Sequence, residues 1–146
     1  MTNLLSCCDG TVETDRAQLV EEIGEFFEVY GQAFSRLDVD GITAMFTLPF
    51  TSFHEMTPSQ WGINEGPVLY EVTRSILNHY KERGITGMTY RLASLLAMGR
   101  DMASVVVTWT AHCQDRTSWN YDSGYHLIRQ DGQWKIYGVI QFDERF

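Results

Sequence analysis

The clearest pattern in the chain is the alternation of apolar and polar side chains over residues 102–142. The first run, over about 103–112, has apolar residues on one parity, which predicts a strand with one buried face. Two further runs, over about 119–130 and 133–142, flank Asp131-Gly132, a dipeptide typical of a two-residue hairpin turn. The C-terminal third is therefore predicted to be an antiparallel meander. The buried parity of its first strand contains Ala103, Val105, Val107, Trp109 and Ala111.

Upstream of this sheet, apolar residues recur at helical spacing between residues 14 and 37. The helix is expected to begin near Thr14 or Asp15, since Asp15 followed by Gln18 resembles a capping box. Its glutamates lie mostly on the opposite side and are interpreted as a solvated face. The apolar face contains Leu19, Ile23, Phe26, Phe27, Tyr30, Phe34 and Leu37, and the glutamates are Glu21, Glu22, Glu25 and Glu28.

The middle of the chain predicts shorter elements. Asp40 is expected to cap a short helix, Pro49 to end helical structure, and residues 50–55 to form a short strand. Residues 56–66 have no periodicity and contain Pro58, Gly62 and Gly66, so they are predicted to be an irregular loop, with Trp61 as a lid candidate.

A third helix is predicted from Pro67 to about Arg83, with Gly84 as its C-cap, followed by a strand over 88–98. The apolar face of this helix is expected to contain Leu69, Val72, Ile76 and Tyr80.

This order of elements predicts an α+β fold in which helices cover one face of a curved antiparallel sheet. The chain has 146 residues, of which 44% are hydrophobic and 13% aromatic, enough for one sizeable core. Residues 1–13 are small, polar and aperiodic and are interpreted as a loose arm, and residues 14–146 as a single domain.

Charge and composition narrow the choice of partners. Eleven basic against 19 acidic residues give a net charge of −8, which would repel a nucleic-acid backbone or an anionic membrane. No apolar run reaches the roughly 18 to 20 residues needed to span a bilayer. The three cysteines form neither a disulfide framework nor a metal-ligand spacing, and the four histidines show no ligand spacing either. We expect a cytoplasmic protein with no metal and no cofactor.

The chain resembles the nuclear transport factor 2-like superfamily, which includes ketosteroid isomerase, scytalone dehydratase, limonene epoxide hydrolase and the SnoaL-like polyketide cyclases. The resemblance covers roughly residues 15 to 143 and rests on three segments. It implies a cone-shaped, cystatin-like sheet wrapped around the long N-terminal helix, with a small apolar ligand at the open end and frequent homodimers. The segments are Leu37-Asp38-Val39-Asp40-Gly41, Ile42-Thr43-Ala44-Met45-Phe46, and Tyr125-His126-Leu127-Ile128-Arg129-Gln130-Asp131-Gly132-Gln133-Trp134-Lys135-Ile136.

The resemblance also implies candidate site residues. With the Asp38 turn laid on that of ketosteroid isomerase without gaps, Tyr30 falls where that family places its oxyanion-binding tyrosine, and His54 where it places a general-base carboxylate. Histidine has an unperturbed pKa of about 6.5 and can exchange a proton near neutrality. An ordinary core tyrosine bonded to a backbone carbonyl, and a strand histidine facing water, are the alternatives.

Other candidates surround this pair. Tyr125 falls near a position where family members carry an inward Asp, and His126 replaces it there if the register slips by one. This departure argues against steroid isomerisation, although a second phenol can still donate to an oxyanion. Trp109 is read as either a pocket wall or plain core. Further candidate pocket residues are Phe50 and Ser52, which share the parity of His54, and Trp61.

The sequence thus predicts a pocket for a small, largely apolar molecule bearing a carbonyl or hydroxyl. Proton transfer next to that carbonyl, by His54 with Tyr30 and Tyr125, would make the protein a cofactor-free isomerase, dehydratase or cyclase. The alternative is a non-catalytic ligand-binding or protein-interaction domain of the same fold. Val106, Thr108 and Thr110 form a β-branched stripe on the outer sheet parity, which predicts a homodimer through that face.

Overall fold

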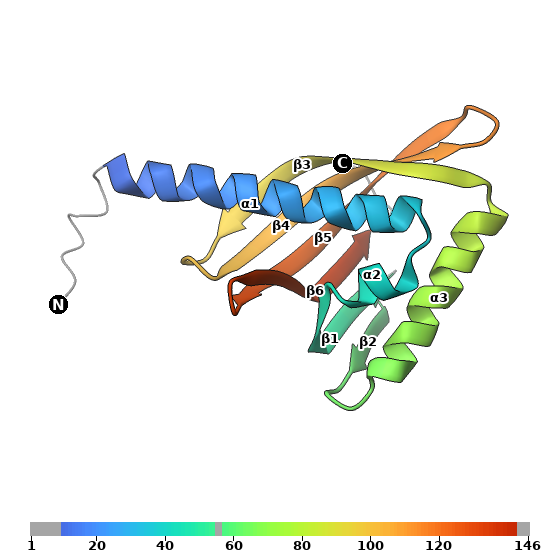
Figure 1. Cartoon of the computed structure of the whole chain (residues 1–146), viewed down its shortest axis with the longest axis horizontal. Helices are drawn as coiled ribbons and strands as arrows, with labels where there is room; N and C mark the ends of the chain where they lie inside the picture. The colour runs from blue at the N-terminus through green and yellow to red at the C-terminus, as the bar shows by residue number, and fades with distance from the viewer. Residues whose placement is uncertain (1–9, 55–56, 143–146) are drawn as a thin grey trace.

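The computed structural model describes residues 10–54 and 57–142, which form three helices and one six-stranded sheet. The strand order is β2-β1-β6-β5-β4-β3, and every neighbouring pair is antiparallel except β1 and β6. Figure 1 shows α1 lying across the curved sheet, with α2 and α3 toward the end where β1 and β2 lie. The predicted α+β class is confirmed. The elements are α1 (Gly10–Ser35), α2 (Val39–Thr43), β1 (Phe46–His54), β2 (Thr57–Trp61), α3 (Gly66–Glu82), β3 (Ile85–Ala97), β4 (Met102–Cys113), β5 (Ser118–Gln130) and β6 (Gln133–Phe142).

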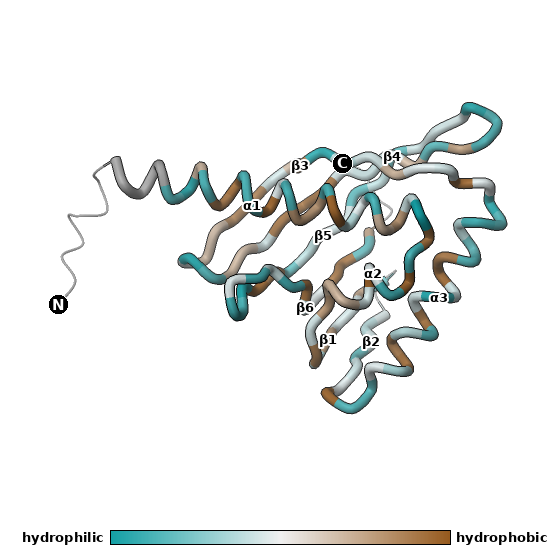
Figure 2. Tube along the Cα trace, in the orientation of Figure 1, coloured by the Kyte–Doolittle hydropathy of each residue, from teal (hydrophilic) through white to brown (hydrophobic). Residues whose placement is uncertain are grey.

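The buried face of α1 packs on the inner parity of the sheet. Ile23, Phe27 and Tyr30 are almost fully buried, as the helical spacing predicted, and apolar and polar residues alternate along α1 in Figure 2. Gly31 allows the helix to approach closely, because a Cβ there would lie 3.1 Å from a ring carbon of Trp109. The centre of the molecule is therefore an aromatic layer between helix and sheet.

The long hairpins have the predicted geometry. Asp131 and Gly132 have φ angles of 51° and 75°, as the two-residue turn between β5 and β6 requires. The C-cap of α3 is Arg83 rather than the predicted Gly84, which follows it with a φ of 75°. In β5 the register places Tyr125 inward and His126 on the outer face, where its Nδ1 lies 2.9 Å from Ser104 Oγ.

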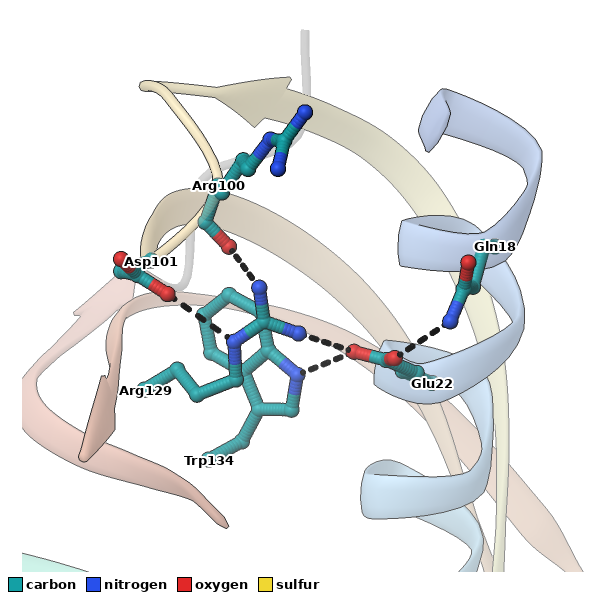
Figure 3. A network of polar contacts seen from close by, with 6 residues as sticks. All are labelled: Gln18, Glu22, Arg100, Asp101, Arg129 and Trp134. Carbon is teal, nitrogen blue, oxygen red and sulfur yellow. Dashed lines mark hydrogen bonds and ion pairs between the residues drawn. The ribbon is translucent and has the colours of Figure 1, made fainter. Parts of the chain in front are cut away.

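A polar network fastens α1 to the turns of the meander (Figure 3). Glu22 Oε2 accepts hydrogen bonds from Arg129 (2.9 Å) and from the indole nitrogen of Trp134 (3.1 Å). Arg129 also donates to Asp101 Oδ1 (3.0 Å) and to the carbonyl oxygen of Arg100 (2.8 Å). The interpretation of Glu22 as part of a solvated face was wrong, because it ties α1 to the β5–β6 and β3–β4 turns.

Several predicted boundaries need correction. The first helix begins at Gly10, so residues 10–13, which were assigned to the loose arm, are helical, while the rest of the arm lies outside the described residues. Asp38, rather than Asp40, caps α2, because its side chain accepts from the backbone N–H of Gly41 at 3.0 Å. The strand predicted over 50–55 begins at Phe46; residue 55 lies outside the described residues.

Two further predictions were wrong in kind. Part of the predicted irregular loop, Thr57–Trp61, is an edge strand paired with β1. It escaped notice because it contains a proline, which an edge strand tolerates, and because four of its five residues are exposed. The buried face of α3 consists of Leu69, Thr73 and Leu77, whereas Val72 and Ile76 are 36% and 40% exposed.

The outer face of the sheet is more polar than its sequence indicated. Thr108 donates to Asp122 (2.6 Å), and Thr110 donates to Asn120 (2.7 Å), so cross-strand hydrogen bonds occupy most of the β-branched stripe. Exposed large apolar side chains of the sheet lie elsewhere, at Phe53 on β1, Leu96 on β3, Met102 on β4, and Ile140 and Phe142 on β6. Within residues 10–54 and 57–142, no helix has the length and apolar character needed to cross a bilayer.

Candidate functional site

A small cavity lies beneath α1, between that helix, α3 and the inner face of the sheet. Its volume is about 30 Å³, and it is partly open. Five residues of the lining are buried, whereas Phe34, Tyr80, Tyr121, Val139 and Gln141 are half-buried and mark the open side. The complete lining is Tyr30, Phe34, Tyr80, Met88, Trp109, Tyr121, Ser123, Tyr125, Val139 and Gln141.

Tyr125 is the centre of the hydrogen bonding in this cavity. The indole nitrogen of Trp109 donates to the Tyr125 oxygen at 2.8 Å. Tyr30 lies next to Tyr125, with ring centroids 5.9 Å apart and ring planes at 78°. A phenol oxygen has two acceptor positions and one proton. The bond from Trp109 uses one acceptor position, so the Tyr125 proton remains available to a further acceptor.

The phenols of this cluster are held in their neutral form. Burial is the largest cause and raises the pKa of Tyr30, Tyr121 and Tyr125 above the ordinary value, because the phenolate would be poorly solvated there. Repulsion between the phenolates raises the pKa of Tyr30 and Tyr121 further, with Tyr80 contributing to both. At neutral pH these side chains are hydrogen-bond donors and do not act as bases.

At the open side, the hydroxyl oxygens of Tyr80 on α3 and Tyr121 on β5 lie 3.4 Å apart. Their long contact links α3 to the sheet across the cavity. Phe34 stacks near Tyr80, with ring centroids 5.8 Å apart and tilted by 43°. The open side is thus formed by aromatic edges and faces with hydroxyl groups between them.

Three of the sequence-predicted site residues meet at this cavity. Tyr30 and Tyr125 converge, and Trp109 is both a wall of the cavity and part of the core. Phe50 and Trp61 lie outside its lining, in an aromatic series that continues from the core. Ring centroids in that series are 6.4 Å apart for Tyr30 and Phe46, 4.7 Å for Phe46 and Phe50, and 5.6 Å for Phe50 and Trp61.

His54 and Ser52 lie further toward the end of β1. Ser52 is half-buried and His54 is exposed; neither is in the cavity lining. In the parallel pairing of β1 with β6, His54 is in register with Gln141, which does line the cavity. His54 therefore lies at the rim of the concave face, and its role as a base stays a prediction.

Sequence reasoning missed Ser123, Tyr121 and Gln141 as site residues, and used Tyr80 only as an apolar helix position. A signal was present in β5, where Ser123 stands between Tyr121 and Tyr125 on one parity. A small side chain between two large ones on the same face leaves space above it. That space is part of the cavity, and Ser123 forms its floor.

The donor set has no metal-binding character. No His, Cys, Asp or Glu occurs among the residues that line the cavity. Across the described part of the chain, no three such side chains gather closely enough to hold a metal ion.

Comparisons with known proteins agree with this fold. The model of a family described as NTF2-like protein (DUF6841) matches residues 21–144, and the chain belongs to this NTF2-like family. The resemblance to the nuclear transport factor 2-like superfamily is thereby confirmed. A search of curated proteins finds no match.

Solved structures with the same fold have low sequence identity. An NTF2-like protein of unknown function from Shewanella oneidensis MR-1 has a TM-score of 0.65 at 12% identity, covering 83% of this chain and 96% of its own. A ketosteroid isomerase-like protein from Erwinia carotovora atroseptica SCRI1043 has a TM-score of 0.61 at 18% identity, covering 82% and 92%. A Streptomyces avermitilis protein of the NTF2-like family, provisionally described as a dehydratase, has a TM-score of 0.61 at 12% identity, covering 85% and 95%. At these identities the similarity shows the fold alone.

Proposed function

We propose that the protein binds a small, neutral and largely apolar molecule through a carbonyl or hydroxyl oxygen that enters the tyrosine-lined cavity. The observation that carries this proposal is the convergence of Tyr30, Trp109 and Tyr125 on one cavity, where the Trp109 N–H donates to Tyr125 and leaves the Tyr125 proton free to donate. A cavity of about 30 Å³ admits the oxygen end of a ligand. The rest of the molecule would lie against Phe34 and Tyr80 at the open side.

The charge of the lining supports a neutral ligand. The cavity contains no cationic group to pair with a carboxylate or phosphate and no carboxylate to pair with an ammonium. An unpaired charge in a buried site loses its hydration without compensation. A phenol donor to a neutral oxygen contributes about 0.5–1.5 kcal/mol, or roughly a twofold to tenfold change in Kd.

The test is an NMR titration of the Trp109 indole N–H with acetophenone, 1-phenylethanol and α-methylstyrene. These probes have similar shapes, but the last has a methylene group in place of the oxygen. We expect the two oxygen-bearing probes to shift the indole signal and to bind more tightly than the hydrocarbon. Tyr125→Phe should weaken their binding, whereas Tyr70→Phe, on α3 and outside the cavity lining, should not. Equal binding of all three probes would refute the proposal.

The second candidate is proton transfer next to a carbonyl, with His54 as the base. It is supported by the register of His54 with Gln141, a residue of the cavity lining, and by the descriptions of two similar structures as ketosteroid isomerase-like and as a dehydratase. Deuterium incorporation into 2-cyclohexenone in D₂O, followed by NMR, tests it. His54→Gln should abolish incorporation while ketone binding persists; incorporation at the wild-type rate in this variant would exclude His54 as the base.

We also propose that the protein forms a homodimer through the outer sheet face. The support is a row of registered residues across the sheet, Phe53, Ile140, Gly124 and Val106, of which Phe53 and Ile140 are 41% and 38% exposed. Analytical ultracentrifugation should give twice the chain mass, and Ile140→Asp should give the monomer. A monomeric wild-type protein at high micromolar concentration would contradict this.

A further inference from the structure

Ser123 is the one buried side-chain polar group in the described part of the chain whose oxygen has no hydrogen-bond partner. The residue is 1% exposed and lies in the middle of β5. A buried hydroxyl without a partner costs stability, and native structures contain few of them. An alanine would fill the same space without that cost. The hydroxyl therefore needs an explanation outside the packing of the core.

The position of Ser123 points to the cavity. It lies between Tyr121 and Tyr125 on the inner parity of β5 and forms the floor of the cavity. Its hydroxyl makes no hydrogen bond of good geometry, but it lies close enough to the Tyr125 oxygen to offset part of the rise that burial causes in the pKa of that phenol. Two hydroxyl groups thus face the same small space, and the proton of Tyr125 is directed away from Trp109, which donates to its oxygen.

We propose that Ser123 and Tyr125 together bind one carbonyl oxygen of the ligand, with Ser123 as the second donor. This inference rests on the proposed function and narrows its ligand class to carbonyl compounds. A carbonyl oxygen accepts two hydrogen bonds near its own plane, which two adjacent donors can supply. Ser123 then serves recognition at the expense of stability, since no group within residues 10–54 and 57–142 makes a hydrogen bond with it.

The neighbouring strands explain why no protein group fills this role. Ser123 is in register with Val107 on β4 and with Gln141 on β6. Val107 is completely buried and apolar, and Gln141 is half-buried at the open side. Within the described residues neither neighbour bonds to the Ser123 hydroxyl, so we expect a ligand in the cavity to supply its partner.

The experiment compares Ser123→Ala with Ser118→Ala, a control on the exposed start of the same strand. Both variants are titrated with acetophenone and α-methylstyrene, with the Trp109 indole signal as the readout, and their thermal unfolding is measured. We expect Ser123→Ala to weaken acetophenone binding about threefold to tenfold, as the loss of one donor implies, and to leave α-methylstyrene binding unchanged. Its Tm should be equal to or higher than that of the wild type.

Each other outcome overturns the inference. If the wild type binds acetophenone and Ser123→Ala binds it equally well, Ser123 is not a ligand donor, while the proposed function stands. If the Tm of Ser123→Ala falls well below that of Ser118→Ala, the hydroxyl has a structural partner. If the wild type binds no oxygen-bearing probe more tightly than the hydrocarbon, the proposed function and this inference fall together.

Discussion

Removing the carboxylate of Glu22 should destabilise the protein far more than its position on the polar side of α1 indicates. One of its oxygens accepts from both Arg129 and Trp134, and the Trp134 side chain belongs to a residue only 8% exposed. In Glu22→Ala the indole N–H loses its partner in a largely buried place, which costs about 1–2 kcal/mol. The ion pair between Glu22 and Arg129 contributes less than this to the free energy of unfolding.

The ion-pair contribution is limited by solvent. The side chains of Arg129 and Glu22 are 25% and 30% exposed, so their attraction is partly screened and contributes about 0.5–1 kcal/mol. Arg129 also retains its bonds to Asp101 and to the carbonyl oxygen of Arg100. The free energy of unfolding should therefore fall by about 2 kcal/mol, or roughly 4–8 °C in Tm for a chain of this length.

Urea unfolding followed by circular dichroism measures this difference. Glu21→Ala is the matched control, because that neighbour is exposed on the same helix. Glu22→Gln should lose about half as much as Glu22→Ala, since its amide oxygen can still accept from Trp134. In 1 M NaCl the difference between Glu22→Gln and the wild type should shrink, because salt screens the charge contribution. If Glu22→Ala and Glu21→Ala lie within 0.5 kcal/mol of each other, where ~0.5 kcal/mol is an ordinary surface effect, the network does not fasten α1.

Three further predictions concern the site and the caps. Tyr125→Phe should lower the free energy of unfolding by about 1–3 kcal/mol, because it leaves the buried Trp109 N–H without its acceptor, whereas Tyr70→Phe should change it by less than about 0.5; chemical denaturation distinguishes them. The contribution of the buried phenols to the free energy of unfolding should be constant below about pH 9 and fall above about pH 10. The fall is up to about 1.4 kcal/mol per pH unit for each phenol with a raised pKa, such as Tyr30, because the unfolded chain releases these protons before the folded one does. A variant with Tyr30→Phe should show a shallower fall in urea titrations at pH 9 to 11. Asp38→Ala should cost about 1 kcal/mol by removing the N-cap of α2, and Asp38→Asn should recover most of it; equal losses in both variants would contradict a capping role.

Periodicity predicted the parts of the fold that bury a continuous face. The helical spacing around Ile23 and Phe27, and the alternation in β4, depend on which side faces the core, and that constraint is visible in any window of the sequence. The turn at Asp131-Gly132 was also predicted from the sequence, because positive φ angles restrict the residues that can occupy it.

The same reasoning failed where burial does not follow polarity. In α3 the polar residue Thr73 is buried together with Leu69 and Leu77. Its hydroxyl donates to the carbonyl oxygen of Leu69 at 2.9 Å and therefore needs no hydrogen bond to water. Choosing apolar residues instead selected Val72 and Ile76, which are partly exposed. A polar side chain satisfied within its own helix is not distinguished by sequence pattern from one that faces solvent.

The site was predicted in part for a related reason. Tyr30 and Tyr125 could be placed from an alignment of turns, and they do meet. Ser123 could not, because a serine in a strand has no significance until the structure shows that nothing bonds to it. A buried hydroxyl without a partner is recognised only from the positions of the groups around it, and these positions come from the structure.

The positions of Tyr125 and His54 restrict what chemistry the site could perform. Tyr125 is in register with Val139, and His54 with Gln141, so the two residues lie two strands apart and two residues apart along the sheet. With strands about 4.8 Å apart and about 3.3 Å per residue, their backbone separation is roughly 12 Å. A proton on C6 of 2-cyclohexenone, next to the carbonyl, lies nearer to an oxygen held by Tyr125, and so further from the imidazole, than a proton on C4. If His54 is the base, 2-cyclohexenone should therefore exchange at C4, which is conjugated with the carbonyl and more remote, before C6. Exchange at C6 alone would mean that the oxygen is held nearer the rim than Tyr125, or that another base acts.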